Sequence, residues 1–230
     1  MTSGRRRAIW GTLSVLVGIV VVFFAIRVVV DTPNVVNGTV PGPDAFERRY
    51  ALHPVPAYVH IVPGVAYLVL APLQLWRRFR VRHLRLHRLI GRIILPAGLL
   101  SGVFAVAVGI GFPYGGPLEA AASVVFGAYF VAALALAYRA VRHRDITGHR
   151  RWMIRAFAVG LGVGTIRIWI GLFQLVGLLS IQDNAGTVWF GVAFWLALLM
   201  HAVAAELYLR ARPAANPDRV SRQQPGAARR

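Results

Sequence analysis

The chain contains no cysteine and no lysine, and only 8 of its 230 residues are acidic. The absence of cysteine excludes disulfide bonds, thiolate metal sites and cysteine nucleophiles. The carboxylates are too few for a metal site made of oxygen ligands, and the sequence carries neither an HExxH motif nor a glycine-rich phosphate loop. Histidine, with seven copies, is the versatile group that remains, as a proton carrier or metal ligand. No catalytic residue is indicated.

Hydrophobic residues make up 57% of the chain and charged residues only 15%, whereas a soluble domain carries about 25% charged residues. Apolar runs of about 20 residues recur, and each is long enough to cross a ~30 Å hydrocarbon layer. The sequence therefore predicts an all-α, polytopic membrane helix bundle whose transmembrane domain covers residues 8–210. We expect six spans, at about 8–30, 56–76, 89–112, 118–141, 153–179 and 188–210.

The segments outside these spans are polar or contain turn signals. Residues 1–7 form a short basic N-terminus, and 31–55 form a loop rich in proline and glycine. The first apolar run exceeds the h-region of a signal peptide and no cleavage site follows it, which favours an uncleaved span. The sequence PYGGP at 113–117 predicts a tight turn. The tail at 211–230 has the composition of a disordered segment.

The distribution of arginine predicts the orientation. The N-terminus, the connections 77–88 and 142–152 with their adjoining helix ends, and the C-terminal tail hold 22 of the 26 arginines. Since positive residues stay on the cytoplasmic side, both termini are expected there, an N-in/C-in arrangement. The absence of lysine is typical of a GC-rich bacterial genome, so the expected location is the bacterial cytoplasmic membrane.

The net charge of +18 does not predict a nucleic-acid partner, because the arginines lie in short loops between apolar runs. The lipid bilayer is the expected partner. The basic loop 77–88 is either a topology signal alone or a contact for anionic lipids at the cytoplasmic face.

Polar and small residues recur at spacings of three and four on three of the predicted helices, which places each set on one helix face. Such a face is either a packing seam or a site. The sets are His60, Gly64, Tyr67, Ala71 and Gln74; His87, Gly91, Ile94, Gly98, Ser101 and Ala105; and Gly160, Gly164, Arg167, Gly171 and Gln174.

Depth along the helices, at 1.5 Å per residue, suggests two polar centres. The outer centre holds His60, Arg167 and Gln174. The inner centre holds His87, Arg92, His149, Arg155 and His201, and Arg92 is also a candidate partner for Glu206. A guanidinium at the depth of Arg167 needs compensation, either from Glu119 or carbonyl groups, or from a bound anion.

Five motifs follow one another along the chain: HPxPAYVHIVPG, APLQL, HRLIGR, HRRWMIR and RIWI. Together they resemble a bacterial family of predicted membrane proteins of unknown function. The similarity covers about residues 45–210 and supports the architecture. The matching positions are His60, Gly64, Gln74, His87, Arg88, Gly91, Arg92, His149, Arg150, Trp152, Met153, Arg155 and Arg167.

A second pattern begins with a histidine that is followed by a glycine four residues later. Leu-Gln, a basic loop and another histidine with the same glycine spacing come next. This order resembles the core hairpin of transmembrane b-type cytochromes. That resemblance implies haem b between histidines of neighbouring helices, with glycine making room for the ring. His60 lacks a partner at its own depth, which departs from the pattern. The implied ligands are His87 with His149 or His201, and the implied propionate contacts are Arg92 or Arg155.

Three functions remain open from the sequence. The first is electron transfer through haem b or a quinone. The second is transport of a small solute or proton past helices that contain Pro63, Pro72 and Pro96, with His60 and Arg167 as outer binding groups. The third is an assembly role in which the glycine faces bind another membrane protein.

Overall fold

The computed structural model describes residues 3–43, 45–180 and 185–211, and these are almost entirely helical. Six of the helices are long and apolar enough to cross a membrane, which confirms the predicted all-α class and the number of spans. They are α1 (Ser3–Asn37), α3 (Pro54–Leu75), α5 (Leu84–Gly111), α6 (Gly116–Arg142), α7 (Ile146–Leu175) and α8 (Val188–Arg210). Two short helices, α2 (Arg48–Leu52) and α4 (Arg77–Arg82), lie between them.

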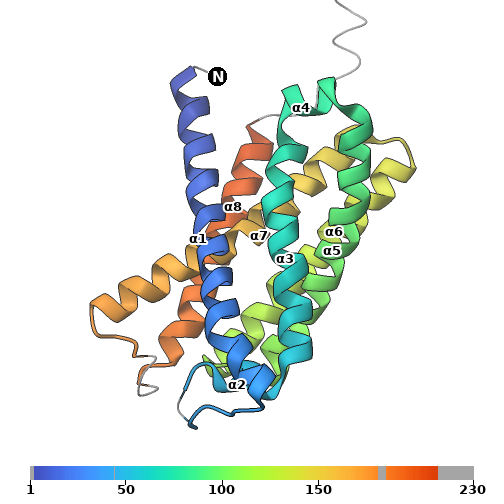
Figure 1. Ribbon diagram of the computed structural model, residues 1–230. Helices are drawn as coiled ribbons and strands as arrows, with labels where there is room; N and C mark the ends of the chain where they lie inside the picture. The colour runs from blue at the N-terminus through green and yellow to red at the C-terminus, as the bar shows by residue number, and fades with distance from the viewer. Residues whose placement is uncertain (1–2, 44, 181–184, 212–230) are drawn as a thin grey trace, which may run out of the picture.

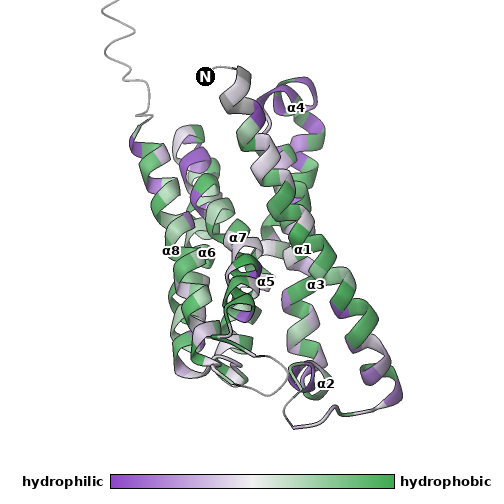
Figure 2. Cartoon of the chain, turned by 90° about the vertical axis from the view of Figure 1, so that its left-hand side faces the viewer, coloured by the Kyte–Doolittle hydropathy of each residue, from purple (hydrophilic) through white to green (hydrophobic). Residues whose placement is uncertain are grey.

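The helices form a bundle in which α7 runs obliquely past its neighbours (Figure 1) and contacts α1, α3, α6 and α8. The start of α1 and the end of α8 lie at the same end of the bundle as α4, whereas α2 lies at the opposite end. The polar residues gather mainly at these two ends, and the middle is apolar (Figure 2). We call the end with α4 the arginine-rich end.

Several helix ends differ from the predicted spans. Helix α1 continues to Asn37, and the loops predicted at 31–55 and 77–88 contain α2 and α4. Helix α7 begins at Ile146 because the carboxylate of Asp145 caps it, accepting a hydrogen bond from the Gly148 amide at 2.7 Å. His149 therefore lies in the first turn of α7 and not in a loop. Apart from Ala211, the tail predicted at 211–230 falls outside the described residues.

Small residues bring the helices close together. A Cβ atom on Gly164 of α7 would lie 2.7 Å from the backbone oxygen of Leu16 in α1, so α1 contacts α7 directly through its backbone. The prolines inside α3 and α5 do not interrupt these helices. Small residues at such crossings are what close packing in a membrane requires, because helices there attract each other mainly by contact.

A tightly packed layer crosses the middle of the bundle. Tyr67 of α3, Ile94 of α5 and Leu134 of α6 are at most 1% exposed. A Cβ atom on Gly98 would lie 2.9 Å from both the Tyr67 ring and the Leu134 side chain. This layer separates cavities that open on either side of it.

Candidate functional site

A cavity with a volume of about 1210 Å³ lies at the arginine-rich end between α3, α5, α6, α7 and α8. We call it the inner cavity. No carboxylate is among the described residues that line it, although seven guanidinium groups are. These belong to Arg80, Arg88, Arg92, Arg142, Arg144, Arg150 and Arg151. A cavity so charged attracts an anionic ligand.

Two of the predicted histidines, His87 of α5 and His149 of α7, line this inner cavity together. The Nδ1 atom of His149 lies 2.9 Å from the carbonyl oxygen of Ala137, so Nδ1 donates its proton and Nε2 keeps a free lone pair. Such a backbone contact fixes the tautomer of a metal-binding histidine. The Nδ1 atom of His87 is buried and has no hydrogen-bond partner among the described residues.

The helices that carry these histidines stand apart. In the described part of the chain, no Cα atom of α5 lies within 8 Å of one in α7. Gln74 of α3, 7% exposed, lines the same cavity, and its Nε2 atom also lacks a hydrogen-bond partner there. A Cβ atom on Gly91 would lie 3.8 Å from the Gln74 amide oxygen. The inner cavity thus lies between helices whose backbones stand apart. Side chains from three helices that line it carry a nitrogen atom without a hydrogen-bond partner among the described residues.

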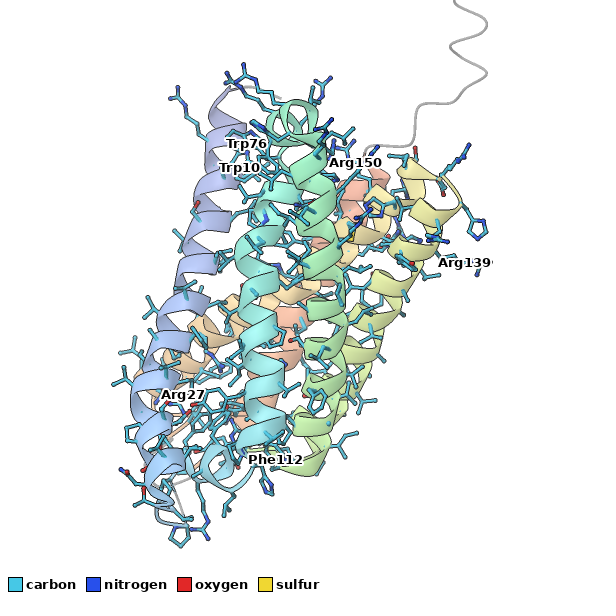
Figure 3. All side chains as sticks on the ribbon, turned by 45° about the vertical axis from the view of Figure 1, so that its right-hand side comes forward. Trp10, Arg27, Trp76, Phe112, Arg139 and Arg150 are labelled. Carbon is cyan, nitrogen blue, oxygen red and sulfur yellow. The ribbon has the colours of Figure 1, made fainter. Side chains whose placement is uncertain are left out.

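His201 lies in a different space. It lines a cavity of about 720 Å³ bounded by α1, α4, α7 and α8, which we call the lateral cavity. Its Nε2 atom is 2.8 Å from the hydroxyl of Thr165. Trp10 and Trp76 also line this cavity, and they meet edge to face with ring centroids 6.2 Å apart (Figure 3).

Arg80 and Arg150 line both the inner and the lateral cavity. Burial lowers the pKa of Arg80 below its ordinary value, and the neighbouring guanidinium groups of Arg150 and Arg77 lower it further. None of these three residues has a carboxylate partner in the described residues. Their mutual repulsion would fall if an anion bound between them.

A third cavity, with a volume of about 220 Å³, lies on the other side of the central layer, and we call it the outer cavity. It shares no lining residue with the other two. His60 lines it, and the Nδ1 atom of His60 lies 3.0 Å from the Ser101 carbonyl oxygen. The Ser101 hydroxyl donates to the His60 carbonyl at 2.7 Å. Gly64 leaves room for this, since a Cβ atom there would lie 2.6 Å from that hydroxyl.

Arginine side chains from three helices line the outer cavity, and carboxylates pair with two of them. Arg27 of α1 lies 3.3 Å from Asp31 and 3.4 Å from Glu47, and Arg49 of α2 lies 3.7 Å from Glu119. The third is Arg167 of α7, which has no carboxylate within 4.0 Å among the described residues. Its guanidinium carbon lies 5.3 Å from the centre of the Phe23 ring.

The geometry corrects two predicted contacts. Glu206 binds Arg155 and not Arg92, through contacts of 2.5 Å and 3.0 Å, because Arg155 lies on α7, next to α8. Glu119 does not pair with Arg167. Glu119 pairs with Arg49 instead, and its carboxylate also accepts a hydrogen bond from the amide of Gly115 at 2.6 Å.

Gln174, predicted in the outer centre, is exposed and does not line the outer cavity.

The structure therefore divides the predicted inner centre. His87, His149 and Arg92 line one cavity, His201 lines another, and Arg155 is held by Glu206. In the outer centre, His60 and Arg167 line one cavity. Sequence reasoning missed the cluster of Arg27, Asp31 and Arg49, although charged residues four apart at the end of an apolar run were the signal.

Six apolar helices, with charged residues mainly at their ends and in cavities, define a polytopic membrane protein. More particularly, the chain belongs to the family described as predicted membrane protein DUF2306, whose family model matches residues 57–209. No curated protein and no solved structure matches it. The inner cavity is built entirely from residues within the matched range, whereas the outer cavity also takes residues from α1 and α2.

Proposed function

We propose that the protein is an electron-transfer protein of the bacterial cytoplasmic membrane that binds haem b in its inner cavity. The observation that carries the proposal is the pair His87 and His149, which line one cavity from helices whose backbones stand apart. Haem b carries two negatively charged propionates, and its iron accepts nitrogen ligands. This cavity offers positive guanidinium groups for the propionates and two histidines as ligands.

The residues present fit the group in three respects. His149 has Nε2 free because its Nδ1 atom binds a backbone carbonyl, and His87 keeps a buried nitrogen without a partner among the described residues. Arg88 and Arg92 line the same cavity and are suited to the two propionates. The volume of about 1210 Å³ exceeds the ~300–1,000 Å³ of ordinary small-molecule pockets, so a large ring can enter.

In this assignment, His87 and His149 would hold the iron, and Arg92 with Arg88 would hold the propionates. The bound group supplies one-electron oxidation and reduction. The Ala137 carbonyl orients the His149 ring, and the surrounding guanidinium groups raise the potential by favouring the form with more negative charge. Arg155 takes no part, because Glu206 occupies it.

A difference spectrum tests the proposal. The protein is purified in detergent from cells supplied with a haem precursor, and the dithionite-reduced spectrum is compared with the oxidised one. We expect sharp Soret and alpha bands in the wild type and in His201→Ala, the matched control from the lateral cavity. The bands should be lost in His87→Ala and in His149→Ala. A flat wild-type spectrum, or equal loss in all three variants, would refute haem binding here.

A quinone is the second candidate for the same cavity, because the buried Gln74 amide has a free donor that a quinone carbonyl would accept. In that case the spectrum is flat and a quinone is recovered from the purified protein. Its amount falls in Gln74→Leu, which has a similar volume and no donor.

We also infer that anionic lipids contact the arginine-rich end. The lateral cavity supports this, because its walls are largely apolar and its rim carries Arg77, Arg78, Arg80 and Arg150 without a lining carboxylate. A lipid phosphate would neutralise the rim while an acyl chain lies against the apolar wall. The orientation predicted from arginine places this end at the cytoplasmic leaflet.

A further inference from the structure

The outer cavity contains hydrogen-bond donors that lack acceptors. Tyr67 lines it at 1% exposure, and its hydroxyl has no hydrogen-bond partner among the described residues. Arg49 also lines this cavity. Its Nε atom is buried and likewise has no hydrogen-bond partner among the described residues. Buried polar groups in native proteins are nearly always paired. A ligand oxygen atom would provide the acceptor that such a donor lacks.

The charge of Arg167 leads to the same conclusion. The other two guanidinium groups of the cavity, on Arg27 and Arg49, are already paired with carboxylates. Arg167 has no carboxylate within 4.0 Å in the described part of the chain, although it lies within a predicted membrane span. A permanently charged group in the hydrocarbon layer is costly unless an anion or water compensates it.

We propose that the outer cavity binds a small aliphatic monocarboxylate whose carboxylate group pairs with Arg167. A guanidinium matches a carboxylate through two parallel hydrogen bonds, which a halide cannot form. Tyr67 donates a further hydrogen bond to the bound oxygen atoms. The site is independent of the haem proposal, because the two cavities share no residue.

The remaining walls determine the rest of the ligand. Apolar side chains dominate the lining, among them Phe23, Val65, Phe130, Val163 and Phe194. These suit an alkyl chain and not a second charged group. A volume of about 220 Å³ equals roughly seven water molecules at ~30 Å³ each. The ligand is therefore a short chain with one carboxylate.

Calorimetric titration of the purified full-length protein tests this, in a chloride-free buffer of constant ionic strength. The probes are acetate, propionate, butyrate, pentanoate, hexanoate and octanoate. Each added methylene should tighten binding about fourfold, the equivalent of ~0.8 kcal/mol, until the chain fills the cavity, and octanoate should bind more weakly than the best member. Binding that is absent, or that does not change with chain length, would overturn the proposal. So would chloride binding more tightly than every carboxylate.

Three variants assign the binding to this cavity. Arg167→Gln should abolish it, Arg167→Lys should weaken it by removing the paired hydrogen bonds, and Tyr67→Phe should weaken it about fivefold, as loss of one hydrogen bond of ~1 kcal/mol predicts. Gln174→Leu, an exposed position on the same helix, is the control and should bind as the wild type does.

If Arg167→Gln fails to fold, the other two variants carry the test, and unchanged affinity in both would overturn the assignment. The haem difference spectrum should be the same in Tyr67→Phe as in the wild type. The two proposals can therefore fail separately.

Discussion

Replacing Gly164 by alanine should weaken the attachment of α1 to the bundle. The new Cβ atom would lie 2.7 Å from the Leu16 backbone oxygen, about 0.7 Å closer than an ordinary contact. Because the obstacle is backbone, no side-chain rotation relieves it, and α1 must move away. Such overpacking costs about 1–3 kcal/mol, whereas alanine in place of glycine stabilises a helix by about 1 kcal/mol. The net loss in the free energy of unfolding should be about 0–2 kcal/mol.

Gly171→Ala on the same helix is the matched control, because a Cβ atom there has nothing within 4 Å. It isolates the gain in helix propensity. Both variants are unfolded by a rising mole fraction of sodium dodecyl sulfate in mixed micelles, followed by circular dichroism. Gly164→Ala should unfold at least about 1 kcal/mol more easily than Gly171→Ala. Equal stability of the two variants would show that the Leu16 contact does not limit the approach of α1.

Three further predictions concern the two ends of the bundle. An impermeant maleimide should label His53→Cys but not His83→Cys in intact cells, since the native chain has no cysteine and the arginine distribution predicts that the arginine-rich end faces the cytoplasm; the reverse labelling pattern would reverse the topology. Glu206→Gln, which removes a bidentate and partly exposed ion pair, should lower the free energy of unfolding by about 1 kcal/mol, and no change in chemical denaturation would contradict this. Arg80→Gln should retain less anionic phospholipid in native mass spectrometry than Arg139→Gln, which lines neither cavity; equal retention would exclude the lateral site.

The membrane spans could be predicted because the solvent imposes them. A segment that must pair its own backbone hydrogen-bonding groups inside hydrocarbon has to be an apolar helix of about 20 residues. The described part of this chain has six such helices. The ends were predicted less well. Helix α7 begins at Ile146, within a segment whose arginines and histidines resemble a loop, because one Asp145 side chain caps it.

The choice of partners among polar residues could not be predicted from depth alone. Arg92 and Arg155 lie at similar depths, so either could be assigned to Glu206. The structure pairs Glu206 with Arg155 because α7 packs along α8, whereas in the described residues no Cα atom of α5 lies within 8 Å of α8. The same limit applies to His201, which the depth estimate assigned to the inner centre with His87 although it lines the lateral cavity. Rotation about each helix axis and the order of helices decide such contacts, and spacing in the sequence specifies neither.

The central layer favours electron transfer over solute transport as the function of this architecture. Tyr67 borders the outer cavity and Ile94 the inner one, and with Leu134 they leave no shared lining residue between the two spaces. A solute crossing the membrane would have to displace these buried side chains, and Tyr67 and Leu134 leave no room even for a Cβ atom on Gly98. An electron needs no such opening. Variants in this layer separate electron transfer from transport. For electron transfer, Gly98→Ala should disturb the packing and destabilise the bundle but keep the haem spectrum of the inner cavity. Solute flux that rises in a smaller-side-chain variant such as Ile94→Ala, with no haem spectrum in the wild type, would favour transport instead.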